Sequence, residues 1–146
     1  MRWLFTSPAP IDHKRVVAEI GRAESLTSGQ IRVLVARHRA PDPVAAARSH
    51  FERLGMERTR ERNAVLIFIA PRSRAFAVIG DKGVHEKCGD AFWQDLAAAM
   101  SGHFRKGDFT AGLIHGIERA GVLLAAHFAP LPSGRNEIPD SVTEVD

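Results

Sequence analysis

The chain has 146 residues, enough for one domain with a sizeable hydrophobic core, and its 45% hydrophobic and 25% charged residues are typical of a soluble globular protein. A net charge of only +3, spread over both signs, argues against a nucleic-acid partner. No apolar run approaches the roughly 20 residues that span a bilayer, and the beginning MRWLFTSPAP lacks the apolar core of a secretory signal. A single cysteine excludes an internal disulfide, so together these features predict a cytoplasmic protein without membrane insertion.

The first part of the chain predicts a helix, a strand and a second helix. Apolar residues recur at helical spacing over residues 11–26, and the sequence TSG then ends the helix. Alternating side chains predict a strand over residues 31–37. Asp42 followed by proline is a helix start, because an aspartate can cap the first free N–H groups and proline fits the first turn. We expect this second helix to end at Gly55.

The second part predicts a hairpin, two further helices and a tail. The continuous apolar run AVLIFIA at residues 64–70 is typical of a central strand covered on both faces. After a short turn, residues 75–79 return as a third strand. Asp90 is expected to begin the third helix and Asp108 the fourth. Residues 129–146 contain proline, glycine and acids without periodicity, which predicts a flexible tail.

This order of elements predicts a single α/β domain over residues 1–128. Its architecture should be a three-layer sandwich, with a small mixed β-sheet flanked by helices on both faces. The first two strands should be parallel and joined by a right-handed crossover, and the third should run antiparallel to the second.

Such a topology gathers polar side chains at one edge of the sheet. The starts of the two parallel strands and the end of the third strand meet there, and with them Glu24, Asn63, Asp81 and Asp90. Asp81 and Asp90 belong to the segment IGDKGVHEKCGD, which crowds ionisable residues and glycines between a strand and a helix. Carboxylate and amide oxygens favour hard cations, so the sequence predicts a Ca²⁺ or Mg²⁺ site formed by these four residues.

Each acid also has a structural interpretation, which the sequence leaves open. Glu24 lies in the last turn of its helix, where its charge opposes the helix dipole by ~0.3–1 kcal/mol, so a salt bridge with Arg62 or Lys82 would explain it. Asp90 directly precedes a helix and would be an N-cap worth about 1 kcal/mol. Asp81, between two glycines, has the position of a turn residue.

Other chemistries have less support. His85 and Cys88 have the spacing of zinc ligands, but no second pair accompanies them, and a structural cysteine is expected. A cysteine phosphatase needs an arginine in the loop that follows its cysteine, and that loop reads GDAFWQ here. The glycines Gly80 and Gly83 match the GxxG of nucleic-acid-binding KH domains, but they follow a strand instead of joining two helices. The opposite edge of the sheet would suit an anion, since it gathers arginines without acids: Arg37, Arg39, Arg72 and Arg74.

An ordered set of segments resembles the TPM domain family: EIGRAESLTSGQIRVLV, RNAVLIFIAP, AVIGDKG with CGDAFW, and FRKGDFTAGLIHGI. The resemblance covers residues 11–128. It implies an α/β sandwich and a divalent-cation site. It further implies weak acid phosphatase activity, as in some members, or an adaptor role in the assembly or repair of membrane complexes, as in others.

The match to the family pattern is incomplete at the acids. Gly80, Gly83 and Asp90 correspond to the family's glycine loop and the aspartate after it. Gln30 and Arg62 stand at positions where the family often has acids, and their presence weakens the cation site that the resemblance implies.

The leading hypothesis is therefore a TPM-like domain that acts as a binding or assembly module for an unidentified protein partner. It would hold Ca²⁺ or Mg²⁺ with Glu24, Asn63, Asp81 and Asp90. The alternative is a weak metal-dependent acid phosphatase. A monomer is expected in either case.

Overall fold

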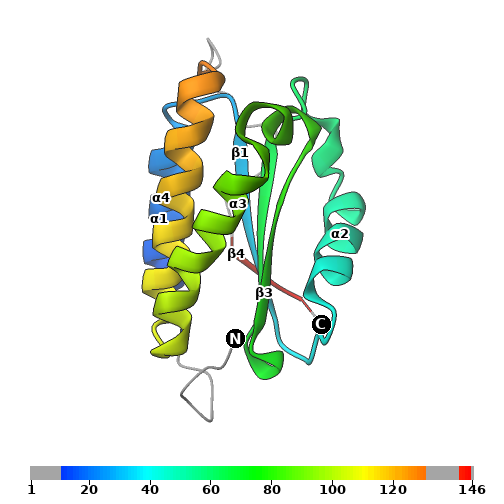
Figure 1. Cartoon of the computed structure of the whole chain (residues 1–146), viewed down its shortest axis with the longest axis vertical. Coiled ribbons are helices and arrows are strands. Elements are labelled where there is room, and N and C mark those ends of the chain that lie inside the picture. The colour runs from blue at the N-terminus through cyan, green and yellow to red at the C-terminus, as the bar shows by residue number, and fades with distance from the viewer. Residues whose placement is uncertain (1–10, 131–141, 146) are drawn as a thin grey trace.

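A four-stranded mixed sheet forms the middle of the molecule. Its strands are β1 Gln30–Ala36, β2 Ala64–Ala70, β3 Ala75–Gly80 and β4 Val142–Val145. The computed structural model describes residues 11–130 and 142–145, and within them the strand order is β3-β2-β1-β4 (Figure 1). β1 and β2 pair in parallel and β3 returns antiparallel to β2, as the sequence predicts.

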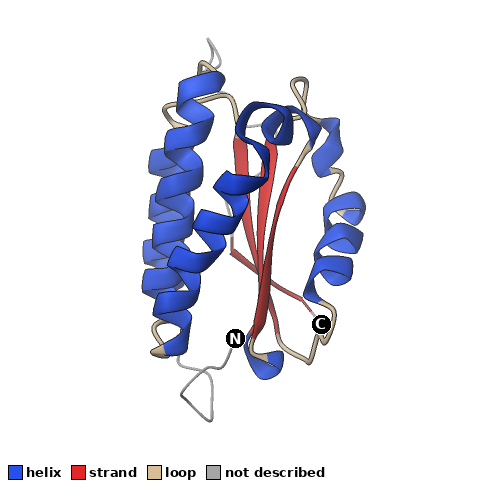
Figure 2. Ribbon diagram, viewed as in Figure 1, coloured by secondary structure: helices blue, strands red, loops and turns tan. Residues whose placement is uncertain are grey.

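Helices cover both faces of the sheet. The α-helices are α1 His13–Glu24, α2 Pro43–Arg53, α3 Lys82–Arg105 and α4 Phe109–His127. Figures 1 and 2 show α1, α3 and α4 on one face and α2 on the other. Two short 3₁₀ turns, η1 Met56–Arg58 and η2 Pro71–Ser73, lie before and after β2. The predicted three-layer α/β sandwich is confirmed.

The apolar run of β2 explains why this strand lies inside the sheet. Every residue of β2 is buried. Val65, Ile67 and Ile69 belong to the core beneath α1, α3 and α4, whereas Leu66 and Phe68 belong to the core beneath α2. Successive side chains of a strand point to opposite faces, so one continuous run serves both cores. Full burial of each such side chain stabilises the fold by about 1.5–3 kcal/mol.

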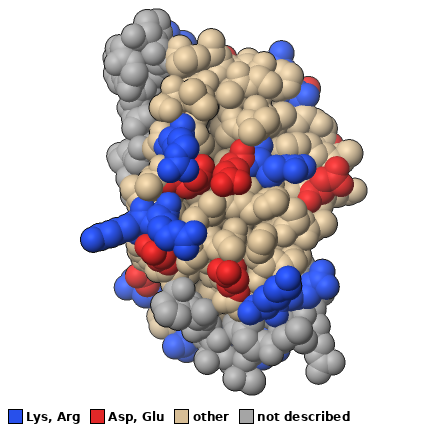
Figure 3. All heavy atoms as spheres, turned by 90° about the vertical axis from the view of Figure 1, so that its left-hand side faces the viewer, with Lys and Arg blue, Asp and Glu red and all other residues tan. Residues whose placement is uncertain are grey.

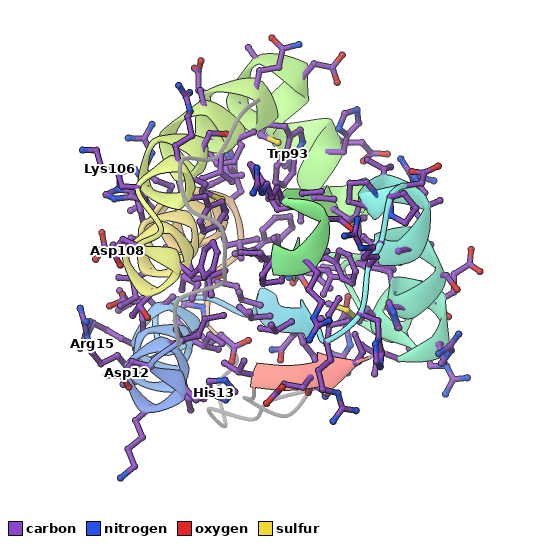
Figure 4. All side chains as sticks on the ribbon, turned by 90° about the horizontal axis from the view of Figure 1, so that it is seen from below. Asp12, His13, Arg15, Trp93, Lys106 and Asp108 are labelled. Atoms are coloured by element: carbon purple, nitrogen blue, oxygen red, sulfur yellow. The ribbon has the colours of Figure 1, made fainter. Side chains whose placement is uncertain are left out.

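Aspartates begin the helices α1, α2 and α4. The side chain of each accepts a hydrogen bond from a backbone N–H in the first turn: Asp12, Asp42 and Asp108. The backbone N–H of Asp12 also donates to Thr110 Oγ1 at 2.9 Å, which ties the start of α1 to the start of α4 at the end of the molecule seen in Figure 4. Helix caps of this kind contribute about 1 kcal/mol each.

The outer surface agrees with the mixed charge of the sequence on the side formed by α1 and α4. Figure 3 shows lysine, arginine, aspartate and glutamate side chains interspersed there among uncharged residues. None of the helices in the described ranges is long and apolar enough to cross a membrane.

The third helix begins earlier than the sequence indicated. We expected a loop up to Asp90, but α3 starts at Lys82 with Asp81 as its N-cap, so most of IGDKGVHEKCGD is helical. Gly89 has φ 72° and ψ 177°, which interrupts the helix and divides α3 into two segments. The glycines of this segment suggested a loop. Gly83 is instead a helical residue at a position where close packing leaves no room for a side chain. A Cβ on Gly83 would lie 2.2 Å from the carbonyl oxygen of Glu61.

Part of the expected flexible tail is a strand. Residues 142–145 form β4, which pairs in parallel with β1 from Val33 opposite Val142 to Ala36 opposite Val145. The sequence VTEV is too short for a reliable pattern, and its pairing with a strand more than a hundred residues away leaves no local signal. Residues 131–141 and 146 lie outside the described part of the chain.

Candidate site at the amino ends of the parallel strands

The predicted meeting of distant segments at one edge of the sheet is present. This edge, called the rim below, comprises the starts of β1 and β2, the end of β3 and the start of α3, and it lies at the upper end of Figure 1. Backbone hydrogen bonds connect its parts: Gln30 N donates to Asn63 O at 3.3 Å, and Asp81 N donates to Ala64 O at 2.9 Å. The backbones of Asn63 and Asp81 are thus held by bonds to the sheet.

Glu24 and Asn63 are both buried, and each bonds to the segment around the start of β1. Glu24 Oε2 accepts a hydrogen bond from Ile31 N at 2.6 Å, which links the end of α1 to the start of β1. Asn63 Nδ2 donates to Ser28 Oγ at 3.1 Å, and Asn63 N donates to Thr59 Oγ1 at 3.1 Å. Asn63 is 1% exposed, and its Oδ1 accepts no hydrogen bond from the described residues. These groups join the loop before β1 to the loop before β2.

Asp81 is paired with Arg62. The guanidinium donates from Nε to Oδ2 at 2.7 Å and from Nη2 to Oδ1 at 2.8 Å, and Lys82 N donates to Oδ1 at 2.8 Å. The Asp81 side chain is 6% exposed and that of Arg62 is 46% exposed. The hydrogen bond to Asp81, the charge of Asp81 and the charge of Glu57 raise the pKa of Arg62, so the arginine stays cationic. The sequence left open a salt bridge between Arg62 and Glu24. In the structure Arg62 forms its salt bridge with Asp81.

Asp90 lies apart from the other acids. It follows the interruption at Gly89, its side chain is 85% exposed, and its Oδ1 is 3.7 Å from His85 Nε2. The side chain that caps α3 is that of Asp81. Asp90 therefore lies on the outer surface of α3, where solvent surrounds its carboxylate.

The four predicted ligands do not fit one divalent cation in this arrangement. Asp81 is held by a guanidinium, Asp90 is solvated, and Glu24 bonds to a backbone N–H. Within the described ranges, no group of three or more His, Cys, Asp and Glu side chains is placed to hold a metal ion. The Ca²⁺ or Mg²⁺ site thus stays a prediction from the sequence, without geometric support.

A cavity opens beside the Arg62–Asp81 pair. We call it the rim pocket; its volume is about 780 Å³, within the range of ligand sites in proteins. Its ionisable lining includes cations and acids, together with a histidine: Arg48, Arg62, Lys82, Glu52, Glu57, Asp81 and His85. Phe51, Ile79 and Gly80 complete the lining. The pocket lies between α2, η1, the end of β3 and the start of α3.

The contribution of α2 to this pocket was missed in the sequence. Arg48 and Glu52 are four residues apart, so they share one face of α2. This spacing is visible in the sequence, but it also fits an ordinary solvated helix face. The position of that face beside the rim depends on how α2 crosses the sheet, which no local pattern gives.

Cys88 is unsuited to nucleophilic chemistry. It is half-buried, and desolvation raises the pKa of its thiol; a backbone hydrogen bond lowers that pKa by less, and the charge of Asp90 adds a still smaller increase. A thiol must ionise to attack a substrate, and this one is held in the neutral form. The structural interpretation of Cys88 agrees with this environment.

The fold and rim define a three-layer α/β domain with a polar site at the amino ends of its parallel strands. The family model described as the TPM domain matches residues 9–123, so the chain belongs to the TPM domain family. The BA42 protein of the psychrophilic bacterium Bizionia argentinensis is 34% identical, with a TM-score of 0.83, over 91% of this chain and 92% of that chain.

Two further solved structures share the fold at low identity. The N-terminal domain of the cg2496 protein from Corynebacterium glutamicum is 15% identical, with a TM-score of 0.60, over 99% of this chain and 95% of that chain. The N-terminal domain of a protein from P. gingivalis is 17% identical, with a TM-score of 0.56, over 76% and 72%. No curated protein matches the chain.

Proposed function

We propose that this TPM domain acts as a binding or assembly module and that the rim pocket is its recognition surface. One observation carries the proposal: both oxygens of Asp81 are engaged, by the Arg62 guanidinium and by the first N–H of α3. A carboxylate that holds a catalytic metal or acts as a general base needs a lone pair directed at the reacting group, and three donors already occupy the Asp81 carboxylate. Asp81 instead stabilises the wall of the pocket.

The lining of the pocket indicates the kind of partner. Arg48, Arg62 and Lys82 supply positive charges, and the three acids of the lining supply negative ones. Phe51 and Ile79 add an apolar surface. A polar segment of a protein that carries charges of both signs would match this surface, because complementary charges give an interface its specificity and register.

Affinity capture with paired variants tests the proposal. Arg48→Glu changes the charge of the pocket, and Arg72→Glu makes the same change in η2, at the opposite edge of the sheet. Both side chains are exposed, so both variants should fold. We expect one protein to bind the wild type and Arg72→Glu but not Arg48→Glu, and the purified partner to reproduce this order. Equal binding by all three forms would exclude the rim pocket as the recognition surface.

An assay with an aryl phosphate separates this proposal from the alternative of a weak metal-dependent acid phosphatase. With millimolar Ca²⁺ or Mg²⁺ we expect no hydrolysis above the metal-containing buffer. Hydrolysis by the wild type that is lost in both Asp81→Ala and Asp90→Ala would favour the phosphatase.

A cytoplasmic location and a monomeric state remain predictions from the sequence. Cell fractionation would test the location, and light scattering would test the oligomeric state.

A further inference from the structure

We propose that the Arg62 guanidinium is a built-in countercharge that replaces a divalent cation at the rim of this TPM domain. The rim would then be stable without a metal ion, because the positive charge of Arg62 takes the place of the ion's charge. The inference concerns the pocket of the proposed function, but its test uses no partner. Failure of partner binding and failure of this inference can therefore be told apart.

The Arg62 guanidinium pairs with the carboxylate of Asp81 and lies within the electrostatic influence of a second acid, Glu57. Its two donors match the two oxygens of Asp81 in the fork arrangement that fits a guanidinium to a carboxylate. Glu57 lines the same pocket, and its charge acts on Arg62. Glu57 Oε2 is buried and accepts no hydrogen bond from the described residues. One guanidinium therefore pairs with Asp81 and acts through its charge on Glu57, and a +2 ion could neutralise the same two carboxylates.

The backbone holds Arg62 in this position. Arg62 has φ 54°, in the left-handed region that asparagine, aspartate and glycine adopt more readily than arginine. Its N–H donates to Thr59 O at 3.2 Å, and its carbonyl oxygen accepts from Gly83 N at 2.8 Å. The loop before β2 is thus fastened to the first turn of α3, and the guanidinium lies directly beside the cap of that helix.

The resemblance to the TPM family suggests what arginine at position 62 changes. The sequence resemblance implies that the family often has an aspartate at the position of Arg62, next to Asn63. An aspartate there would add a carboxylate beside Asp81, and the two would repel each other unless a cation bound between them. Arginine removes that carboxylate and supplies the positive charge. Asn63, the next residue, is buried, and its Oδ1 has no hydrogen-bond donor among the described residues.

The test compares thermal unfolding of the wild type, Arg62→Asp and Arg72→Asp, each with EDTA and with millimolar CaCl₂ or MgCl₂. Arg72→Asp is the matched control, because it makes the same charge change on an exposed residue at the opposite edge of the sheet. We expect Arg62→Asp to have a lowered Tm in EDTA and to gain roughly 2–4 °C or more with calcium, since a ligand that binds only the folded state raises its stability. The wild type and Arg72→Asp should not respond to metal.

Several results would overturn the proposal. A calcium-dependent rise in the Tm of the wild type that is absent from Arg62→Asp would place a bound cation at the native rim. A folded Arg62→Asp protein without a metal response would show that the rim is no cation position in either form. If Arg62→Asp does not fold in EDTA, calcium should restore it, and the milder Arg62→Asn should behave in the same way. Failure of metal to restore either variant counts against the proposal.

Discussion

The Arg62 guanidinium and the Asp81 carboxylate form a two-point hydrogen-bonded ion pair, with distances of 2.7 Å from Nε to Oδ2 and 2.8 Å from Nη2 to Oδ1. This pair joins the loop before β2 to the first turn of α3. It also forms part of the wall of the rim pocket. The acid that the sequence singled out as a metal ligand is therefore part of the scaffold.

Asp81→Ala should destabilise the fold more than an ordinary cap substitution. Loss of the cap alone should lower the free energy of unfolding by about 1 kcal/mol, and loss of the ion pair adds to it. Asp42→Ala is the control, because Asp42 caps α2 at a solvent-exposed position by accepting from Ala45 N, a backbone N–H of the first turn. Urea unfolding measures both. Equal losses in the two variants would show that the pair with Arg62 contributes nothing to stability.

Asp90→Ala should have little effect, in contrast to the cap that the sequence suggested. Its side chain is 85% exposed, and surface substitutions away from specific features usually change the free energy of unfolding by less than about 0.5 kcal/mol. Asp108→Ala, which removes an observed cap, should cost about 1 kcal/mol in the same experiment. A loss at Asp90 as large as the loss at Asp108 would restore the cap interpretation.

Two glycines of α3 should respond to alanine in opposite directions. At Gly83 a Cβ would lie 2.2 Å from Glu61 O and 2.7 Å from Arg62 O, so Gly83→Ala must push the loop before β2 away and should cost about 1–3 kcal/mol. Gly102 has no atom within 4 Å of the added Cβ, and Gly102→Ala should stabilise the helix by up to about 1 kcal/mol. Thermal or urea unfolding distinguishes the two. Stabilisation by Gly83→Ala would contradict the close contact.

Cys88 should react slowly with alkylating reagents at neutral pH. Its pKa is raised above the ordinary value of 9.0, mainly by desolvation, so the fraction of thiolate is smaller than in an unfolded chain. This raised pKa also makes stability depend on pH. The neutral thiol contributes fully to stability below the pKa that Cys88 has in the unfolded chain, and this contribution is lost as pH rises through its pKa in the folded protein. Mass spectrometry of iodoacetamide labelling, with the urea-unfolded protein as reference, measures the rate. Faster labelling of the folded protein at pH 7 would contradict the assignment.

The fold was largely predictable because its main signals are local. The apolar run of residues 64–70 and the alternation before it give two buried parallel strands, and capping by Asp42 and Asp108 gives two helix starts. β4 was not predictable, since four residues that pair with a distant strand carry no periodic pattern. α3 was started too late, because Gly83 was interpreted as a loop residue when it is a point of close packing.

The candidate site was predictable in place but not in its pairing. Topology alone brings Asn63 and Asp81 to one edge, because the start of β2 and the end of an antiparallel β3 must coincide. The pairing of Asp81 depends on Arg62, whose positive φ directs the loop toward α3. A positive φ is unusual for arginine, so no propensity would predict it. The separation of Asp90 follows from Gly89, whose conformation interrupts α3 just before it.

The most direct test of the account is a titration of the ¹⁵N-labelled wild-type protein with CaCl₂, and then MgCl₂, followed by NMR. If Arg62 supplies the positive charge of the rim, the amide signals of Asn63, Asp81 and Lys82 should not shift beyond the general effect of ionic strength, even at millimolar metal. Saturable shifts at these amides that EDTA reverses would show that the rim binds a divalent cation despite Arg62, and would contradict the account.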